Sequence, residues 1–221
     1  MRRFTAAATL AVFMTAPVFG ALSSREQQRI EEAANVLRDL HAAPDQDIPA
    51  DMWEKASCVM VVPGLKKAAF FLGGEYGKGL MSCRRNNAWS PPVFMRLGKG
   101  SWGLQIGAQS IDLVLLVMND KGIEKLLRNG VSLGAEASVA AGPVGRDARV
   151  ATDAQMTAEI LSYSRTQGVF AGVNISGGVV RDDVEDNADL YGAGITARDI
   201  LLEGRVQLPG IARPFVEALR R

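Results

Sequence analysis

From residue 57 onward, apolar and polar residues alternate with a period of two, and this alternation restricts the fold more than any other feature of the chain. Apolar side chains occupy every second position at 102–108, 131–139 and 169–175. A strand with this pattern buries one face and exposes the other, as strands of antiparallel sheets do. The run at 111–118 is apolar almost throughout and predicts a central strand, and shorter apolar runs at 58–62 and 69–72 predict two more.

Helical periodicity occurs before, within and after these strands. Residues 23–41 predict a helix that Ser23 or Ser24 caps, and residues 50–56 predict a short second helix. Asn119 is expected to cap a third helix that ends at Gly130, and short helices are expected at 196–202 and 215–219. The predicted fold class is α+β: a glycine-rich, twisted antiparallel sheet or partly closed barrel with N-terminal, inserted and C-terminal helices.

The first twenty residues are typical of a secretory signal peptide. Arg2 and Arg3 precede an apolar core at 5–16, and Val18 and Gly20 occupy positions −3 and −1 of a cut before Ala21. The alternative is an N-terminal anchor that stays uncleaved. We expect a signal peptide at 1–20, an N-terminal helical segment at 21–56 and an α+β domain at 57–221, with 22–221 as one folding unit. The mature protein would then be periplasmic or secreted, and membrane-associated if it binds lipid.

Positive charge is concentrated in one segment of a nearly neutral chain. The formal net charge is +1, yet residues 64–100 carry +6, whereas residues 21–63 carry −4 and residues 101–221 carry −3. The basic residues of the segment are Lys66, Lys67, Lys78, Arg84, Arg85, Arg96 and Lys99. This asymmetry predicts an anionic partner. The alternative is that alternation divides these residues between two faces, where they only solvate an edge strand.

Export narrows the choice of anion, because a secreted protein seldom meets nucleic acid. We expect anionic phospholipid or another acidic component of a membrane surface, and each basic side chain near such a surface contributes about 1 kcal/mol. Aromatic residues interleaved with the basic ones are candidates for insertion among the lipids. They are Phe70, Phe71, Tyr76, Trp89 and Phe94.

Cys58 and Cys83 are the two cysteines of the chain. In an oxidising compartment such a pair predicts a disulfide, and the alternative is two buried thiols. Two cysteines and one distant histidine, His41, do not predict a metal site.

Three motifs lack the context that their chemistry requires. The G-x-S-x-G pattern at 130–134 follows a helix and precedes a strand, which is the reverse of a nucleophile elbow. The glycine-rich run at 73–79 lacks the Ser or Thr and the following helix of a phosphate loop. The acidic run at 182–189 lacks the glycine and glutamate of a calcium loop and predicts a solvated acidic turn that opens a helix. We therefore expect no enzymatic activity, no cofactor and no metal.

Several ordered motifs closely resemble the SYLF-domain family. They are VVPGLKKA at 61–68, GGEYGKG at 73–79, WSPP at 89–92, GLQIGAQ at 103–109, DLVL at 112–115, LGAEASVAAGPVGR at 133–146, SYSRTQGVFAG at 162–172 and YG at 191–192. The resemblance extends over residues 30–203, nearly the whole of the expected mature chain.

The resemblance implies lipid binding. Eukaryotic SYLF domains bind phosphoinositide-containing membranes and some are linked to actin, whereas bacterial members are mostly exported or lipid-anchored. This chain departs from the eukaryotic pattern because it shows no accessory lipid-binding or peptide-binding module and no basic amphipathic leading helix. Since export also argues against actin, the expected function is an exported, non-enzymatic domain that attaches to anionic phospholipid through its basic segment. The alternative is a scaffolding or structural protein of the envelope that acts through protein contacts.

Overall fold

A computed structural model describes residues 22–42, 48–69, 72–102, 107–128, 130–144, 157–166 and 169–220. The helices are α1 (Ser24–His41), α2 (Ala50–Lys55), α3 (Asp120–Leu126), α5 (Val184–Tyr191), the π-helix η2 (Asp199–Glu203), the 3-10 helix η3 (Gly210–Ala212) and α6 (Arg213–Ala218). The strands are β1 (Cys58–Ala69), β2 (Leu72–Arg85), β3 (Ala88–Trp89), β4 (Val93–Trp102), β5 (Gly107–Val117), β6 (Val131–Ser132), β7 (Val139–Ala141), β8 (Ile160–Thr166), β9 (Val169–Gly172) and β10 (Val179–Asp182).

Side-chain caps fix the beginnings of two predicted helices. At α1 the Ser23 hydroxyl accepts a hydrogen bond from the Glu26 backbone N–H, and the Glu26 carboxylate accepts one from the Ser23 N–H. This reciprocal pair satisfies backbone donors that have no partner inside the helix. At α3 the Asn119 side chain accepts from the Gly122 N–H. The predicted start points of both helices are confirmed.

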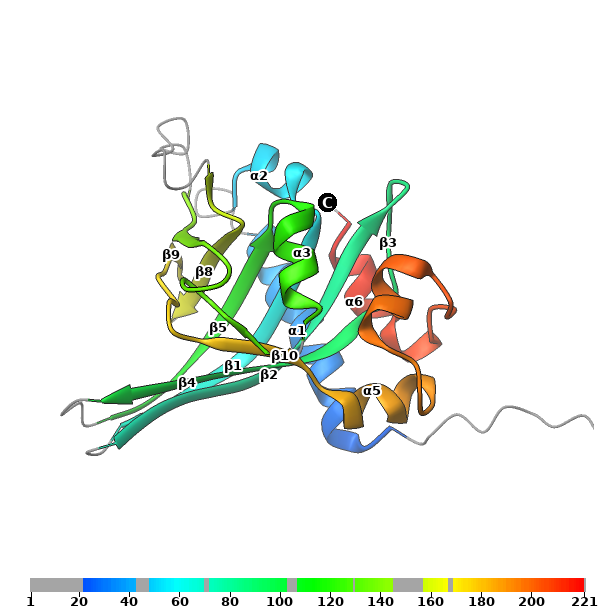
Figure 1. The fold of residues 1–221 in the computed structure, drawn as a ribbon, viewed down its shortest axis with the longest axis horizontal. Helices are drawn as coiled ribbons and strands as arrows, with labels where there is room; N and C mark the ends of the chain where they lie inside the picture. Colours follow the sequence, from blue (N-terminus) through cyan, green and yellow to red (C-terminus); the bar gives the residue numbers. More distant parts are fainter. Residues whose placement is uncertain are drawn as a thin grey trace, which may run out of the picture.

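The described strands form one curled sheet in the order β6-β10-β4-β2-β1-β5-β8-β7, with β3 paired to β2 and β9 paired to β8. The neighbours pair antiparallel except β7 and β8, which are parallel. Strand β5 lies between β1 and β8, so the prediction of a central strand there is confirmed. The predicted α+β class is confirmed as well: the sheet curls into a half-barrel, with helices before, within and after it (Figure 1).

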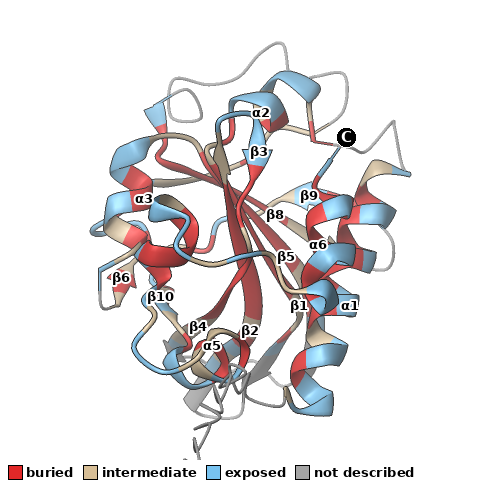
Figure 2. Ribbon diagram, turned by 90° about the vertical axis from the view of Figure 1, so that its right-hand side faces the viewer, coloured by how far each residue is buried: buried red, intermediate tan, exposed pale blue. Residues whose placement is uncertain are grey.

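Two apolar layers enclose the middle of the sheet. On one face, α1, α2 and α6 pack against buried residues such as Val61 and Val114. On the other face, α3, β6, β10 and η2 pack against residues such as Met60 and Leu115. Figure 2 shows the central strands buried and the helices exposed only on their outer sides. Within the described ranges, no helix is both long enough and apolar enough to cross a membrane.

Four strands extend beyond these layers as an arm, visible at the lower left of Figure 1. We define the arm as residues 66–69 of β1, 72–76 of β2, 99–102 of β4 and 107–110 of β5. It begins just after a β-bulge, where β1 holds one extra residue between Val62 and Leu65. Gly64 has a φ of +58° there, and its N–H donates to the Asp112 carboxylate at 2.9 Å. Because bulges bend strands, this contact marks the point where the arm leaves the body.

Several predicted strand boundaries were wrong. The runs at 69–72 and 102–108 are not strands of their own: β1 ends at Ala69 and β2 begins at Leu72, while β4 ends at Trp102 and β5 begins at Gly107. Residues 70–71 and 103–106 lie outside the described residues. The alternating run at 131–139 is divided into β6 and β7 by a turn at Gly134, which has a φ of +86°. The strand predicted at 169–175 ends at Gly172.

Candidate functional site

The structure separates the seven basic residues of 64–100 into three locations. Lys78 and Arg96 lie against α5, where Asp183 and Asp186 contact them. Arg84 and Arg85 lie at the far end of β2, beside α2 and η2. Lys66, Lys67 and Lys99 lie on the arm. A strand advances about 3.3 Å per residue, so the arm and the far end of β2 are about 26 Å apart and cannot contact one headgroup.

Lys78 is the centre of a partly buried ion-pair cluster. Its ammonium lies 2.6 Å from Asp183 Oδ2 and 3.0 Å from Asp186 Oδ2. Arg29 of α1 reaches Asp186 at 2.5 Å, and Arg96 Nε lies 3.7 Å from Asp183 Oδ1. The Asp183 side chain is fully buried. These contacts connect α1, α5 and the sheet, so Lys78 has a structural role that its sequence position did not reveal.

The pKa values of the cluster follow from these contacts. Burial alone would lower the pKa of the Lys78 ammonium, but hydrogen bonds to Asp183 and Asp186 raise it above the ordinary value. Burial alone would raise the pKa of Asp186, but hydrogen bonds from Lys78 and Arg29 outweigh burial and lower it. Lys78 and Asp186 are therefore both ionised at neutral pH.

Arg84 and Arg85 are held by the protein itself. The Arg84 guanidinium stacks over Trp89 at 4.3 Å from the ring centroid and donates to the Trp53 carbonyl at 3.2 Å. The guanidinium of Arg85 packs against the backbone of Gly204, where a methyl group would overlap it. Both side chains are half-buried. They stabilise the end of β2 and are not grouped with the arm.

The arm holds the remaining lysines. Lys66 is exposed and lies opposite Tyr76 in the β1–β2 register, and 53% of the Tyr76 surface is exposed. Lys67 pairs with Glu75, and Glu75 pairs in turn with Lys99 on β4. Positions 66 and 67 are neighbours in a strand and so belong to opposite faces of the arm. The arm therefore carries three lysines and one acid, divided between two faces.

Two of the five predicted aromatic insertions are core residues. Phe94 is fully buried and Trp89 is buried under Arg84, so these two assignments were wrong. Phe70 and Phe71 lie outside the described residues. Tyr76 is the predicted aromatic that the structure places on the surface of the arm.

The prediction that residues 182–189 form a solvated acidic turn was partly wrong. The run opens helix α5 as predicted, but it is not solvated throughout, because Asp183 and Asp186 are buried. The Asn187 side chain is also buried, and it accepts from the Phe94 N–H and donates to the Phe94 carbonyl. Periodicity could not reveal this, because the cations that pair with the two aspartates come from three distant segments.

Cys58 and Cys83 are joined by a disulfide. They are directly opposite each other in the β1–β2 register, and both are buried in the core cluster beneath α3. The bond therefore joins two neighbouring central strands.

Two basic residues near Lys78 and Arg96 lie outside 64–100 and were not among the predicted site residues. Arg29 comes from α1 and Arg181 comes from β10. Arg181 lies directly opposite Arg96, and Arg96 lies directly opposite Lys78. An antiparallel pairing of 179–182 with 95–98 would have been needed to predict this, and β10 was not predicted.

An apolar groove of about 640 Å³ lies between the start of α1, the end of α5 and the segment before η3. Its lining includes Leu22, Tyr191, Leu208 and Ile211, with Gln27 and Gln207 as polar members. Among the residues that the structure describes, no charged side chain lines it. An anionic headgroup would therefore bind elsewhere. In the same described portion of the chain, no three His, Cys, Asp or Glu side chains are grouped to hold a metal ion.

The fold and its surfaces define an α+β domain whose charged residues serve packing and an exposed strand arm. Residues 98–221 match the Ysc84 family, described as "Las17-binding protein actin regulator". The match covers more than half of the chain, so the protein belongs to this family, and the SYLF-domain resemblance is confirmed.

Curated relatives of the chain include fungal and animal proteins. It is 35% identical to an SH3 domain-containing protein of Schizosaccharomyces pombe over 72% of this chain and 38% of that protein. It is 30% identical to Protein YSC84 of Saccharomyces cerevisiae over 86% of this chain and 42% of that protein. It is 29% identical to the human SH3 domain-containing YSC84-like protein 1 over 90% of this chain and 59% of that protein. The chain thus spans about two fifths to three fifths of these relatives.

Proposed function

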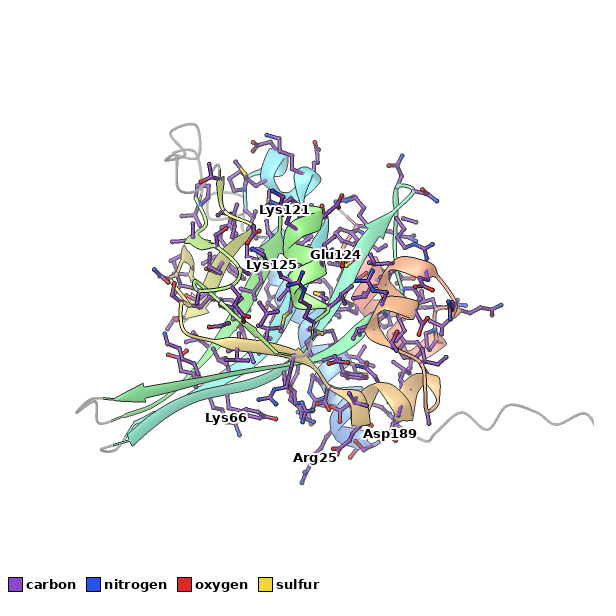
Figure 3. All side chains as sticks on the ribbon, in the orientation of Figure 1. Arg25, Lys66, Lys121, Glu124, Lys125 and Asp189 are labelled. Carbon is purple, nitrogen blue, oxygen red and sulfur yellow. A yellow bond between two sulfur atoms is a disulfide. The ribbon has the colours of Figure 1, made fainter. Side chains whose placement is uncertain are left out.

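We propose that this protein is an exported, non-enzymatic domain that attaches to anionic phospholipid through its arm. The observation that carries the proposal is the arm itself, which projects beyond both apolar layers (Figure 1). It presents two exposed residues, Lys66, which is labelled in Figure 3, and Tyr76. A lysine beside a tyrosine suits a membrane interface, where the ammonium meets headgroups and the ring meets the acyl boundary. The predicted signal peptide would bring the domain to a compartment bounded by such surfaces.

The expected attachment is weak and reversible. Three lysines and one glutamate give the arm a net charge of +2, and each basic residue near the surface contributes about 1 kcal/mol. The interaction would also weaken with salt, because the arm is exposed. The residues expected to contact lipid are now Lys66, Lys67 and Lys99, since Lys78, Arg84, Arg85 and Arg96 have partners within the protein.

Flotation with vesicles tests the proposal. The double variant Lys66→Glu/Lys99→Glu changes the arm by four charge units, two on each face. It should lose about 4 kcal/mol of binding to phosphatidylglycerol vesicles at low salt if both faces contact headgroups, and about 2 kcal/mol if one face does. The control Lys55→Glu/Lys121→Glu changes the same charge on α2 and α3, and Lys121 lies far from Lys66 in Figure 3. The proposal fails if wild-type protein binds phosphatidylcholine equally well, or if both double variants lose binding to the same extent.

Export is tested separately by N-terminal sequencing of the protein recovered from the cell envelope. The sequence should begin at Ala21, and an intact Met1 would contradict export by cleavage.

The names of the relatives connect them to Las17, and the family description connects the family to actin. We do not extend actin to this chain, because an exported protein would not meet the actin of the cell that makes it.

A further inference from the structure

We propose that Lys78, Arg96 and Arg181 form, together with Arg29, a binding site for a dianionic phosphomonoester group. The first three residues, which we call the cation row, lie directly opposite one another on the neighbouring strands β2, β4 and β10. Like charges that face each other across a sheet destabilise it. A row of three cations therefore requires anions beside it.

The anions that the protein supplies do not balance the cations. Asp183 and Asp186 are the carboxylates that contact the row, and Arg29 adds a fourth cation through its 2.5 Å contact with Asp186. Four cations and two carboxylates leave an excess of two positive charges. Arg181 is exposed and has no ion pair within the described ranges, and Arg96 reaches Asp183 only at 3.7 Å. The excess charge therefore lies at the Arg96–Arg181 end of the row.

This end of the row is more exposed to solvent than the two carboxylates. The side chains of Arg96 and Lys78 are 33% and 26% exposed, whereas Asp183 is fully buried. An incoming anion would thus meet guanidinium groups before it met a carboxylate. Arginine offers planar, paired N–H donors that match phosphate oxygens.

Charge selects the class of ligand. A phosphomonoester carries about −1.5 to −2 at neutral pH and three acceptor oxygens, which matches an excess of two positive charges. A phosphodiester carries a single negative charge and would leave the row partly uncompensated. The row lies on the face of the sheet that carries Lys66, because Lys66, Tyr76 and Lys78 occupy alternate paired positions. A phosphomonoester of a lipid headgroup and a soluble phosphomonoester share this chemistry.

Titration of the full chain with inorganic phosphate tests the site without a membrane. Arg181→Gln removes the exposed cation but leaves the contacts of Lys78 intact, and Arg128→Gln is a matched change at an exposed arginine after α3. Wild-type protein should bind phosphate saturably, and Arg181→Gln should weaken binding about tenfold, while Arg128→Gln leaves it unchanged. Absence of saturable binding, or equal losses in the two variants, would overturn the site.

Binding to vesicles distinguishes a lipid phosphomonoester from a soluble one. Of the two experiments, only this one rests on the proposed function. Phosphatidic acid and phosphatidylglycerol are compared at equal surface charge. A preference for phosphatidic acid that Arg181→Gln abolishes supports the site and assigns it to a lipid headgroup. Phosphate binding without that preference supports the site and assigns it to a soluble ligand. A preference for phosphatidic acid that survives Arg181→Gln contradicts the site. If wild-type protein binds inorganic phosphate but neither kind of vesicle, only the proposed function is contradicted.

Discussion

Replacing Lys78 by Met should destabilise the fold strongly, although the charge pattern of the sequence placed this lysine among the membrane contacts. The change removes the ammonium that lies 2.6 Å from Asp183 and 3.0 Å from Asp186. Asp183 is fully buried, and among the described residues its carboxylate would keep only the Arg96 Nε, at 3.7 Å, as an ion-pair partner. Loss of one partner from a buried pair costs about 3–5 kcal/mol, and the remaining arginines favour the lower end, about 3 kcal/mol.

Urea unfolding followed by circular dichroism measures this cost. Lys66→Met is the matched control, because Lys66 is exposed on the same face of the neighbouring strand, and its change should stay within about 0.5 kcal/mol. The double variant Lys78→Met/Asp183→Asn should be less destabilised than the sum of its single variants, since it removes the unpaired buried charge. Equal stabilities of Lys78→Met and Lys66→Met would show that the cluster contributes nothing.

The pH dependence of this effect has a definite sign. The pKa of Asp186 is lowered in the folded state, so its contribution is present above the unfolded value of 3.8 and is lost as pH falls through the folded value. The pKa of Lys78 is raised, so its contribution is present below 10.5 and is lost as pH rises through the folded value. The difference between wild type and Lys78→Met should therefore be largest between these limits and should shrink in acid.

Three further outcomes follow from the sheet. Mass spectrometry of unreduced, alkylated protein should find Cys58 and Cys83 bridged, and their replacement by Ser should cost about 3 kcal/mol; two alkylated thiols would contradict the bridge. Gly79→Ala should cost at least 1–3 kcal/mol because its Cβ would overlap the β1 backbone, whereas Gly98→Ala meets open space and should unfold like wild type. Asp112→Ala should cost about 1.5 kcal/mol and increase amide exchange in the arm, whereas unchanged exchange would show that the carboxylate does not hold the bulge.

Local signals predicted much of the fold. Caps at Ser23 and Asn119 located α1 and α3, because capping depends on neighbouring residues alone. The nearly continuous apolar run of β5 predicted a central strand, and residues of β5 belong to both apolar layers. The ends of strands were harder to predict. The alternating run at 102–108 begins at the last residue of β4 and ends within β5, so alternation alone did not show that two strands are involved.

The site was harder to predict because its residues meet through register. The seven basic residues of 64–100 are close in sequence, yet alternate positions of a strand face opposite ways and a long strand separates its ends. Lys66 and Lys67 are adjacent in sequence but lie on different faces, whereas Lys78 and Arg181 are a hundred residues apart but belong to one row. Only the pairing of β10 with β4 brings the latter two together, and no short pattern encodes that pairing.

The same register explains why a basic segment can be structural and functional at once. Where the sheet is covered, at Lys78 and Arg96, the opposing helix α5 supplies Asp183 and Asp186, because buried cations without partners would destabilise the fold. Beyond the bulge no helix covers the strands, and Lys66 has no ion pair within the described ranges. The charge that the arm offers to a membrane therefore depends on where the cover ends, and the bulge at Gly64, held by Asp112, lies at that boundary.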